Sequence, residues 1–291
     1  MNIALIPNPS KPDAVAAATR LLTLLSARPE ITATVLLTPN RQELLKAQPD
    51  LVVVLGGDGS ILSTAQSLAG INAPVAGVNF GKLGYLAAFS LEEFLHHLDG
   101  ILARRLPTTR RLMLHAATFK APHGGHLLPS ELAGLTPCAA GFAVNDVVIN
   151  AGDPFRMIEL TVQIDGHQTT TFRSDGVIVS TPSGSTGYNL SAGGPLVSPD
   201  VEAMVLTPIC PHSLSFRPVV LAADVQVLIL PCRLNAGTKV IFDGQMTHPI
   251  REDEILLIKR AKTPLTLLEN PAVTHWQMLA KKLHWAQNPR Q

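Results

Sequence analysis

The stretch LVVVLGGDGS, residues 51–60, constrains the fold more than any other part of the chain. Five consecutive apolar residues are typical of a strand that is buried on both faces of a parallel sheet. Two glycines follow, then Asp58 and Gly59, so a carboxylate stands in a turn that otherwise carries no side chains. A helical pattern begins at Ser60. We therefore expect a strand, a glycine-rich turn and a helix, in the order that α/β folds use.

The N-terminal third of the chain repeats this alternation of strand and helix. Short apolar runs predict strands at 3–7, 32–37, 51–56 and 73–79, and helical spacing predicts helices at 14–25, 60–70 and 90–106. Ser90 and Glu93 form the sequence pattern of a capping box. The run Arg104, Arg105, Arg110 and Arg111 is read as a solvated helix end and linker, with a phosphate-binding patch as the alternative.

The pattern changes to strand length after about residue 105. Strands are expected at 110–119, 141–150, 156–165, 168–174, 175–181, 219–231, 238–244 and 253–260. The prediction is an α/β N-terminal domain with a Rossmann-like parallel sheet, residues 1–105, followed by an all-β, β-sandwich-like domain, residues 106–271. A C-terminal helix at about 272–285 is expected to pack back on the first domain. Residues 120–137 are read as a loop between strands.

Composition and charge exclude several classes of protein. Of the 291 residues 46% are hydrophobic and 15% charged, which is typical of a globular protein. The net charge of +1 provides no general basic field for nucleic acid. The apolar runs are too interrupted to span a membrane, and the N-terminus lacks the pattern of a signal peptide. The cysteines Cys138, Cys210 and Cys232 show no disulfide or zinc spacing, and we expect them to be reduced core thiols in a cytoplasmic protein.

The glycine-rich turn after residue 56 is expected to bind phosphate. Ligands of open parallel sheets bind outside the carboxyl ends of the strands, and the helix that begins near Ser60 offers free N–H groups to an anion. Neither GxxxxGK[ST] nor GxGxxG is present, so the turn is neither a P-loop nor a standard dinucleotide-binding crossover.

Asp58 does not suit a turn that only holds phosphate, because a carboxylate repels phosphate. One interpretation is that Asp58 accepts the proton of a hydroxyl group that attacks phosphorus, as an aspartate does in other kinases. The alternative is that Asp-Gly is a turn pair in which Asp58 caps the next helix. The GGDG pattern alone does not decide between them.

Four further segments carry polar residues in positions that a ligand would explain. GVNFGKLGYL, residues 77–86, is a strand and a second glycine-rich turn, which would place Asn79 and Tyr85 beside the first loop. In AVNDVVI the pair Asn145 and Asp146 interrupts an apolar strand, where an unpaired polar group is costly. The alternative for this pair is a strand end or a bulge with access to solvent.

The remaining two segments lie further along the chain. Residues 173–199, RSDGVIVSTPSGSTGYNLSAGGPLVSP, lead from an apolar strand into a loop with many hydrogen-bonding groups and one tyrosine, which suits a nucleotide or sugar better than a metal. No GxSxG pattern marks Ser183 or Ser185 as a nucleophile. In FDGQMTH, residues 242–248, Gln245 is available to bind, and a plain hairpin turn is at least as good an interpretation.

Taken in order, these blocks resemble the NAD kinase family. GGDGS, GVNFGKLGYL, NDVVI, SDGVIVSTPSGSTGYNLSAGGPLVSP, PHSLSFRPVVL and DGQ carry the resemblance, and LAKKLHW near the C-terminus also fits. The resemblance implies ATP-dependent phosphorylation of the 2′-hydroxyl of the adenosine ribose of NAD to give NADP, with a divalent metal, usually magnesium. It also implies an NAD site between the two domains, a homodimer or homotetramer, and neither nucleic-acid nor membrane partners.

The resemblance also implies roles for individual residues. Asp58 would be the proton acceptor with Gly59 beside it, and Asn145 and Asp146 would hold the NAD ribose. Arg173 and Asp175 would contact NAD near its nicotinamide end, and Arg156 would be a further ligand contact. No residue is assigned to a metal. The pocket would also be lined by Asn79, Tyr85, Thr186, Gly187, Tyr188, Asn189, Leu190, Ser191 and Gln245.

The chain departs from the family pattern at three positions and leaves two alternatives open. Asp146 stands where glutamate is usual, Gly187 where alanine is usual and Ser60 where threonine is usual; the shorter Asp146 loses about one C–C bond of reach. A lipid or sugar kinase that shares GGDG is one alternative, although lipid kinases lack the block at 180–194. A catalytically silent NAD-binding regulator is the other, and turnover of NAD and ATP to NADP distinguishes it.

Overall fold

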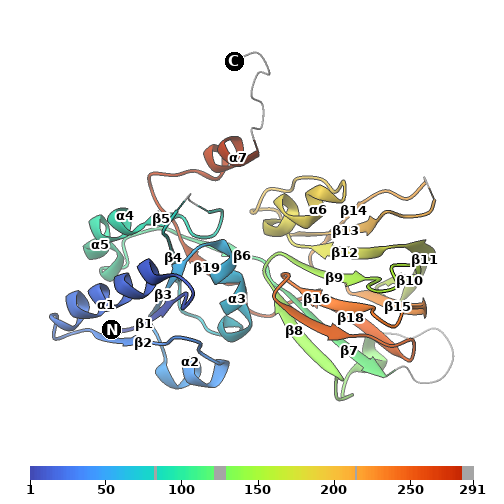
Figure 1. Cartoon of the computed structure of the whole chain (residues 1–291), viewed down its shortest axis with the longest axis horizontal. Coiled ribbons are helices and arrows are strands. Elements are labelled where there is room, and N and C mark those ends of the chain that lie inside the picture. Colours follow the sequence, from blue (N-terminus) through green and yellow to red (C-terminus); the bar gives the residue numbers. More distant parts are fainter. Residues whose placement is uncertain (82–83, 121–128, 214, 284–291) are drawn as a thin grey trace, which may run out of the picture. The chain divides into compact units, whose positions relative to one another are not determined.

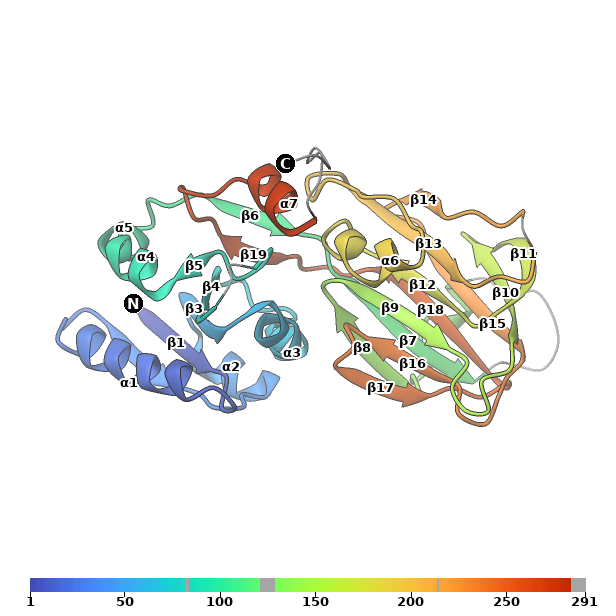
Figure 2. The same ribbon diagram turned by 45° about the horizontal axis from the view of Figure 1, so that its top comes forward.

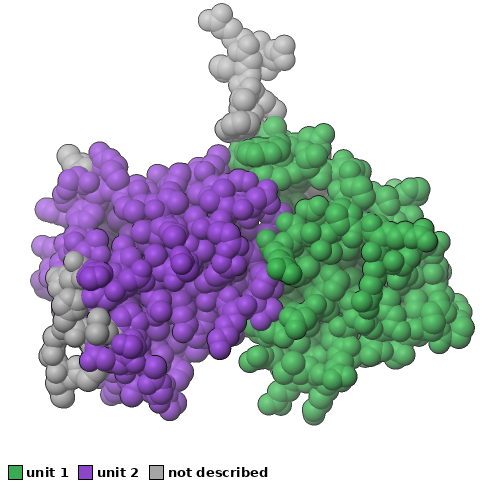
Figure 3. Space-filling model, turned by 180° about the vertical axis from the view of Figure 1, so that it is seen from behind, with its two compact units in different colours: residues 1–110, 265–291 green, residues 111–264 purple. Residues whose placement is uncertain are grey.

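The computed structural model describes residues 1–81, 84–120, 129–213 and 215–283, which form two compact units. Unit 1 comprises residues 1–110 together with 265–291, and unit 2 comprises residues 111–264 (Figure 3). The sequence pattern places the last boundary near 271. The structure places it before Leu265, because the strand that begins there pairs with unit 1.

Unit 1 is a seven-stranded sheet flanked by helices (Figure 1). The strands are β1 (Asn2–Pro7), β2 (Thr32–Val35), β3 (Leu51–Gly56), β4 (Val75–Asn79), β5 (Phe89–Ser90), β6 (Thr108–Arg111) and β19 (Leu265–Leu268). The helices are α1 (Pro12–Ser26), α2 (Arg41–Ala47), α3 (Asp58–Leu68), α4 (Leu91–His96), α5 (Leu98–Leu102) and α7 (His275–Leu283). The order β2-β1-β3-β4-β19-β6 runs through the sheet, and β5 pairs with β4.

The strand order fixes where a ligand site is expected. The pairings of β1 with β2 and β3, and of β3 with β4, are all parallel. From β1 the chain continues to β2 on one side, whereas β3 and β4 lie on the other side. The loops after β1 and β3 therefore flank the point at which the strand order reverses, where open parallel sheets bind ligands. The turn with Asp58 is one of these two loops.

Burial explains the elements of unit 1. All six residues of β3 are buried, and the core cluster of unit 1 contains apolar residues of β1, β3, β4, α1 and α4. The capping box of Ser90 and Glu93 is present, with Glu93 N–H donating to Ser90 Oγ at 3.1 Å. The helix predicted at 90–106 is divided at His97, which is the C-cap of α4 and the N-cap of α5.

Unit 2 is a sandwich of two six-stranded antiparallel sheets (Figure 2). The first has the order β11-β10-β15-β18-β7-β8 and consists of β7 (Leu114–Lys120), β8 (Ala139–Ala143), β10 (Ile158–Ile164), β11 (His167–Ser174), β15 (Val227–Arg233) and β18 (Glu254–Arg260). The second has the order β14-β13-β12-β9-β16-β17 and consists of β9 (Asp146–Asn150), β12 (Gly176–Ser180), β13 (Ala203–Ile209), β14 (Val219–Ala222), β16 (Lys239–Phe242) and β17 (Met246–Pro249). One apolar cluster with residues from both sheets fills the space between them. The predicted fold class, α/β followed by a β-sandwich, is confirmed.

Three segments predicted as single strands are each two strands. The segments 110–119, 141–150 and 219–231 are interrupted between β6 and β7, between β8 and β9, and between β14 and β15. In all three the chain leaves one sheet at the interruption and enters another. In each segment the residues on both sides of the interruption fit a strand pattern, so periodicity alone does not reveal the change of sheet.

The prediction for the cysteines is wrong, and parts of the predicted loop and of the predicted C-terminal helix lie outside the described residues. Cys138, Cys210 and Cys232 are free but exposed, so the prediction that they are core thiols is wrong. Part of the predicted loop, residues 121–128, lies outside the described residues, as does the end of the predicted C-terminal helix after Leu283. Within the described part of the chain, none of the helices has the length and apolar character to cross a membrane.

Candidate functional site

Asp58 is held by the backbone of the second glycine-rich turn. Its Oδ1 accepts hydrogen bonds from the N–H groups of Leu86 at 3.0 Å and Ala87 at 2.9 Å, and its Oδ2 accepts one from Tyr85 N–H at 2.8 Å. A Cβ built on Gly84 would collide with the carboxylate, so only glycine fits there. Asp58 is the first residue of α3, whose N-cap is Gly57. Among the described residues, the Asp58 carboxylate bonds to the N–H groups of residues 85–87 and to Lys282, and not to its own helix. The interpretation of Asp58 as a helix cap is therefore wrong.

The turn between β3 and α3 leaves space for a ligand and lies close to a cation. A Cβ on Gly56 would collide with the Ser60 hydroxyl, which accepts hydrogen bonds from Gly57 N–H at 3.3 Å and from Asn8 Nδ2 at 2.9 Å. A Cβ on Gly57 would lie 3.4 Å from the Asn79 side-chain oxygen and 3.8 Å from the Lys11 ammonium nitrogen. A helix N-terminus with an adjacent ammonium group suits a phosphate.

Asn8 and Lys11 are not among the residues predicted from the sequence, although the sequence contains a signal for both. They follow β1 directly, in the segment PNPSK, and the carboxyl end of β1 adjoins that of β3. A cavity of about 310 Å³ lies at this edge of the sheet, and its lining is rich in hydroxyl and amide groups: Asn8, Thr38, Ser60, Ser63, Thr64 and Ser67. These groups can donate and accept hydrogen bonds to a polar ligand.

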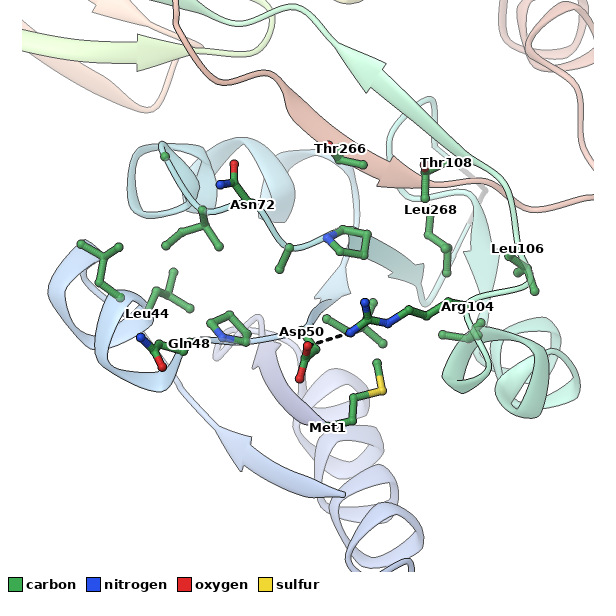
Figure 4. A pocket seen from close by; sticks show the side chains of 18 residues that line it. Met1, Leu44, Gln48, Asp50, Asn72, Arg104, Leu106, Thr108, Thr266 and Leu268 are labelled. Atoms are coloured by element: carbon green, nitrogen blue, oxygen red, sulfur yellow. Dashed lines mark hydrogen bonds and ion pairs between the residues drawn. The ribbon is translucent and has the colours of Figure 1, made fainter. Parts of the chain in front are cut away.

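A larger cavity, of about 650 Å³, lies at the other edge of the same sheet. Its lining includes Leu51, the first residue of β3, and Thr266 near the start of β19, so it adjoins the amino ends of the strands. Figure 4 shows Arg104 extended toward Asp50 beside this cavity, and the two side chains form an ion pair at 2.7 Å. This pairing supports the interpretation of Arg104 as part of a helix end. The cavity is remote from Asp58, which follows the last residues of β3.

Helix α7 supplies a cation to Asp58. Lys282 Nζ lies 3.3 Å from Asp58 Oδ2 and 4.6 Å from the centroid of the Tyr85 ring. Burial, and to a lesser extent Asp58, raise the pKa of Tyr85 above its ordinary value. The sequence analysis assigned only a packing role to this helix and missed Lys282.

In unit 2 two buried carboxyl groups lie at the start of β9. Asp146 is 7% exposed and Asp243 is 9% exposed. Asp243 accepts hydrogen bonds from the N–H groups of Val144 at 2.8 Å, Asn145 at 2.7 Å and Asp146 at 3.0 Å. Burial and the adjacent Asp243 raise the pKa of Asp146 to about 7. Burial also raises the pKa of Asp243 to about 6, against the effect of its three N–H donors.

These contacts change the interpretation of the Asn145–Asp146 pair. Asn145 does not lie inside a strand but between β8 and β9, and Asp146 is the first residue of β9. The alternative of a strand end is therefore correct for their backbone. Asp243 holds that backbone in place and was read only as a turn residue. Its signal in the sequence was a carboxylate directly after an apolar strand, as with Asp58.

The loop after β12 bonds to the backbone of Val144 and Asn145, just before β9. Thr181 N–H donates to Asn145 O at 2.8 Å, and its hydroxyl donates to Val144 O at 2.5 Å. A Cβ on Gly184 would collide with Asn145 O, so the loop approaches this backbone closely. The loop folds into a 3₁₀ turn (Ser183–Thr186) and the short helix α6 (Tyr188–Ser191). The predicted blocks at 143–149 and 173–199 are thus brought together.

Tyr188 lies among the polar residues of this region and is 42% exposed. Burial raises the pKa of its hydroxyl, and the nearby Cys210, Asp146 and Asp175 add to the effect, whereas a hydrogen bond with the Asn150 side chain opposes it. Asp146, Asp175 and Tyr188 therefore form one group. The sequence analysis did not select Asn150.

The other candidate residues of unit 2 differ in exposure. Asn189 is fully buried, and its side chain bonds to Ser185 O at 3.3 Å, Pro195 O at 3.0 Å and the Thr207 hydroxyl at 2.7 Å. Its side chain is thus occupied by bonds within the loop and to β13. Thr186 donates to Ser183 O at 3.3 Å, and Leu190 is half-buried. The candidates that are exposed are Gly59 of unit 1 and, in unit 2, Arg156, Arg173, Gly187, Ser191 and Gln245.

No group of three or more His, Cys, Asp or Glu side chains within the described ranges could hold a metal ion. Magnesium is often bound by one or two carboxylates together with the phosphates of a substrate. Asp58, directly after the glycine pair that follows β3, is a carboxylate that could take part in such binding.

Comparison with known proteins gives consistent results. Family models described as ATP-NAD kinase N-terminal domain and ATP-NAD kinase C-terminal domain match residues 37–106 and 144–270. The chain is 41% identical over 250 residues to an NAD kinase of Aromatoleum aromaticum (strain DSM 19018 / LMG 30748 / EbN1), which covers 85% of this chain and 78% of that protein.

Two solved structures have similar folds. The crystal structure of yeast NADH kinase complexed with NADH has a TM-score of 0.84 at 24% identity and covers 100% of this chain and 89% of that chain. The structure of an NAD kinase from Archaeoglobus fulgidus in complex with ATP has a TM-score of 0.72 at 25% identity and covers 93% of this chain and 94% of that chain.

Proposed function

The chain belongs to the NAD kinase family, and on that premise we propose how its residues carry out ATP-dependent phosphorylation of the 2′-hydroxyl of the adenosine ribose of NAD. In this reaction the 2′-oxygen attacks the γ-phosphorus of ATP, ADP leaves, and the hydroxyl proton passes to a base. We assign that base to Asp58. The product is NADP.

The contacts of Asp58 are the observation that carries this assignment. Three backbone N–H groups fix the carboxylate at the carboxyl edge of the parallel sheet, beside the glycine-rich turn and the N-terminus of α3. A base must be held within hydrogen-bond reach of the proton that it accepts, about 2.6–3.2 Å. A carboxylate that the main chain holds in one position could be kept within this distance of a bound hydroxyl group.

The phosphates of ATP are proposed to bind at the turn after β3. The N–H groups at the start of α3 and the ammonium group of Lys11 near Gly57 provide positive charge there. Bound magnesium would neutralise part of the phosphate charge. The protein then has to position the two substrates and stabilise charge on the transferred group, which accounts for most of the catalysis in phosphoryl transfer.

NAD recognition is assigned to the polar group of unit 2. With a pKa of about 7, Asp146 is protonated in some molecules and ionised in others at neutral pH. The protonated form can donate a hydrogen bond to a ribose hydroxyl, and the ionised form can accept one. Tyr188 offers a half-exposed ring for stacking on a flat heterocycle. Asn145, Asp175 and Arg173 are proposed to complete the contacts. A homodimer or homotetramer stays a prediction.

Asp58→Asn tests the assignment of the base. We expect kcat to fall by about 10²–10⁴, the usual contribution of a positioned base. The Kd of NAD, measured by calorimetry, should change by less than about threefold, because asparagine can still bind the hydroxyl group and the other proposed NAD contacts lie in unit 2. Asp13→Asn is the matched control, since Asp13 is also an acidic residue in the first turn of a helix and is exposed. A fall of less than about fivefold in a folded Asp58→Asn protein would show that Asp58 is not the base.

A further inference from the structure

All hydrogen-bonding positions of the Asp58 carboxylate are occupied. A carboxylate offers about four lone-pair positions on its two oxygens. Oδ1 accepts from Leu86 and Ala87 N–H, and Oδ2 accepts from Tyr85 N–H and Lys282 Nζ. A hydroxyl group that is to give its proton to Asp58 must therefore displace one of these four donors.

Lys282 is the donor that can leave. The three N–H groups belong to a backbone segment that is closed by a bond from Gly84 N–H to Ala87 O at 3.0 Å, and the Leu86 and Ala87 side chains are buried. Lys282 makes the longest of the four contacts, 3.3 Å, through a flexible side chain that is 29% exposed. Rotation of that side chain moves no backbone.

We propose that Lys282 is a catalytic residue of the phosphoryl transfer. It occupies Asp58 Oδ2 while the acceptor is absent. The ribose hydroxyl displaces it, and its ammonium group then binds the oxygens of the transferred phosphoryl group. The inference rests on the proposed role of Asp58 as the base.

Distances support this second position. The attacking oxygen would lie about 2.6–3.2 Å from Oδ2 and about 3–3.5 Å from phosphorus. An ammonium group that starts 3.3 Å from Oδ2 therefore reaches the phosphoryl oxygens by rotation of the side chain alone. The Tyr85 ring, 4.6 Å away, stabilises the cation during this movement and keeps it near the site.

The transfer forms one bond to the γ-phosphorus and breaks another. The bond between the 2′-oxygen and the γ-phosphorus forms, and the bond from that phosphorus to the bridging oxygen of ATP breaks, with its electron pair remaining on ADP. The hydroxyl proton passes to Asp58. Lys282 stays protonated and stabilises negative charge on the phosphoryl oxygens, the role that arginine and lysine side chains have in other phosphotransferases.

Unit 1 holds α7 in position for this role. Met278 and Leu279 are buried, and Asn270, just before the helix, donates from Nδ2 to Ala88 O at 2.9 Å. Ala88 follows the segment that binds the Asp58 carboxylate. A hydrogen bond thus joins the segment that leads into α7 to the residue that follows the Asp58-binding segment.

The test compares Lys282→Met, which removes the charge, with Lys282→Arg, which keeps it. We expect Lys282→Met to lower kcat by about 10²–10³, as removal of a donor to developing charge does, with a change of less than about threefold in the KM of NAD. Lys282→Arg should retain at least ten times the kcat of Lys282→Met. Lys281→Met is the matched control, because Lys281 is the exposed preceding residue on the same helix.

Chemical rescue separates catalysis from support of the fold. Ethylammonium should raise the turnover of Lys282→Ala at least tenfold and should leave Asp58→Asn unchanged, because an amine in solution replaces a charge but not the packing of a helix. A double variant of Asp58→Asn and Lys282→Met should be about as slow as the slower single variant, because both residues act on one step.

The outcomes distinguish this inference from the proposed function. If Asp58→Asn is slow while Lys282→Met turns over within threefold of wild type, only the role of Lys282 is overturned. If Lys282→Met is slow but neither arginine nor ethylammonium restores turnover, Lys282 is structural and the inference is again overturned. If Asp58→Asn itself is near wild type, the base assignment fails and this inference fails with it.

Discussion

The buried carboxyl group of Asp146 should make the stability of the protein without substrates decrease as the pH rises. Burial and Asp243 raise the pKa of Asp146 from 3.8 to about 7. Between these two pH values the folded protein binds more protons than the unfolded chain does. The free energy of unfolding therefore falls as the pH rises through this range. Asp146→Asn removes the titration and keeps the size of the side chain.

The expected magnitude follows from the change in pKa. One pKa unit corresponds to about 1.4 kcal/mol, so the rise from 3.8 to about 7 sets an upper value of about 4 kcal/mol for the cost of ionising Asp146 in the folded state. Because Asp146 is 7% exposed and water can reach it, we expect about 2–4 kcal/mol. In a unit of this size that corresponds to a difference in Tm of roughly 5–15 °C at pH 8.

Thermal unfolding followed by circular dichroism at pH 5, 6, 7 and 8, without NAD or ATP, measures this effect. The Tm of Asp146→Asn should already exceed that of wild type moderately at pH 5, because the unfolded carboxyl group is ionised above pH 3.8, and the difference should grow toward pH 8. Asp200→Asn is the control, because Asp200 is exposed. A constant difference between wild type and Asp146→Asn from pH 5 to pH 8 would refute the reasoning, since it would mean that Asp146 is already ionised in the folded protein at pH 5.

Two further predictions concern the position of the base and the recognition of the acceptor. Gly84→Ala should lower kcat by about 10² or more, because the new methyl group would displace the Asp58 carboxylate. Gly81→Ala is the control and should turn over like wild type, because its methyl group would meet no atom of the described residues within 4 Å. Equal rates for the two variants would show that the Asp58 position tolerates the change. Asp175→Ala should raise the KM of NAD about tenfold and leave that of ATP nearly unchanged. Steady-state titrations of both substrates measure this, and a rise for ATP alone would move Asp175 to the donor site.

The parallel sheet of unit 1 could be predicted because its strands are short, apolar and separated by helical patterns. The apolar run of β3 has no polar face to expose to solvent, so it predicts burial on both faces of the sheet, and all six of its residues are buried. The pairing of β19 with β4 could not be predicted in this way. Leu267 pairs with Val75 across most of the chain, and local periodicity contains no information about partners that distant in sequence.

The residues of the candidate site also fall into two groups, those that local sequence reveals and those that only distant contacts bring together. Glycine-rich turns and polar residues next to apolar strands identified Asp58, Asp146 and the loop after β12, because each stands out against its own neighbours. Lys282 and Lys11 do not stand out, since a lysine on a helix or in a loop is ordinary. Only the fold brings them beside Asp58 and Gly57.

Unit 2 interrupts unit 1 between two neighbouring strands, β6 and β19. During synthesis from the N-terminus, the end of β4 can pair with β5 early, but Val75 lacks its permanent partner Leu267 until about 190 further residues have been translated. Unit 2 is complete by then and can fold as the chain grows. Lys282, which contacts Asp58, is synthesised after unit 2 and after β19. The contact between Asp58 and Lys282 can therefore form only after unit 2 has been synthesised.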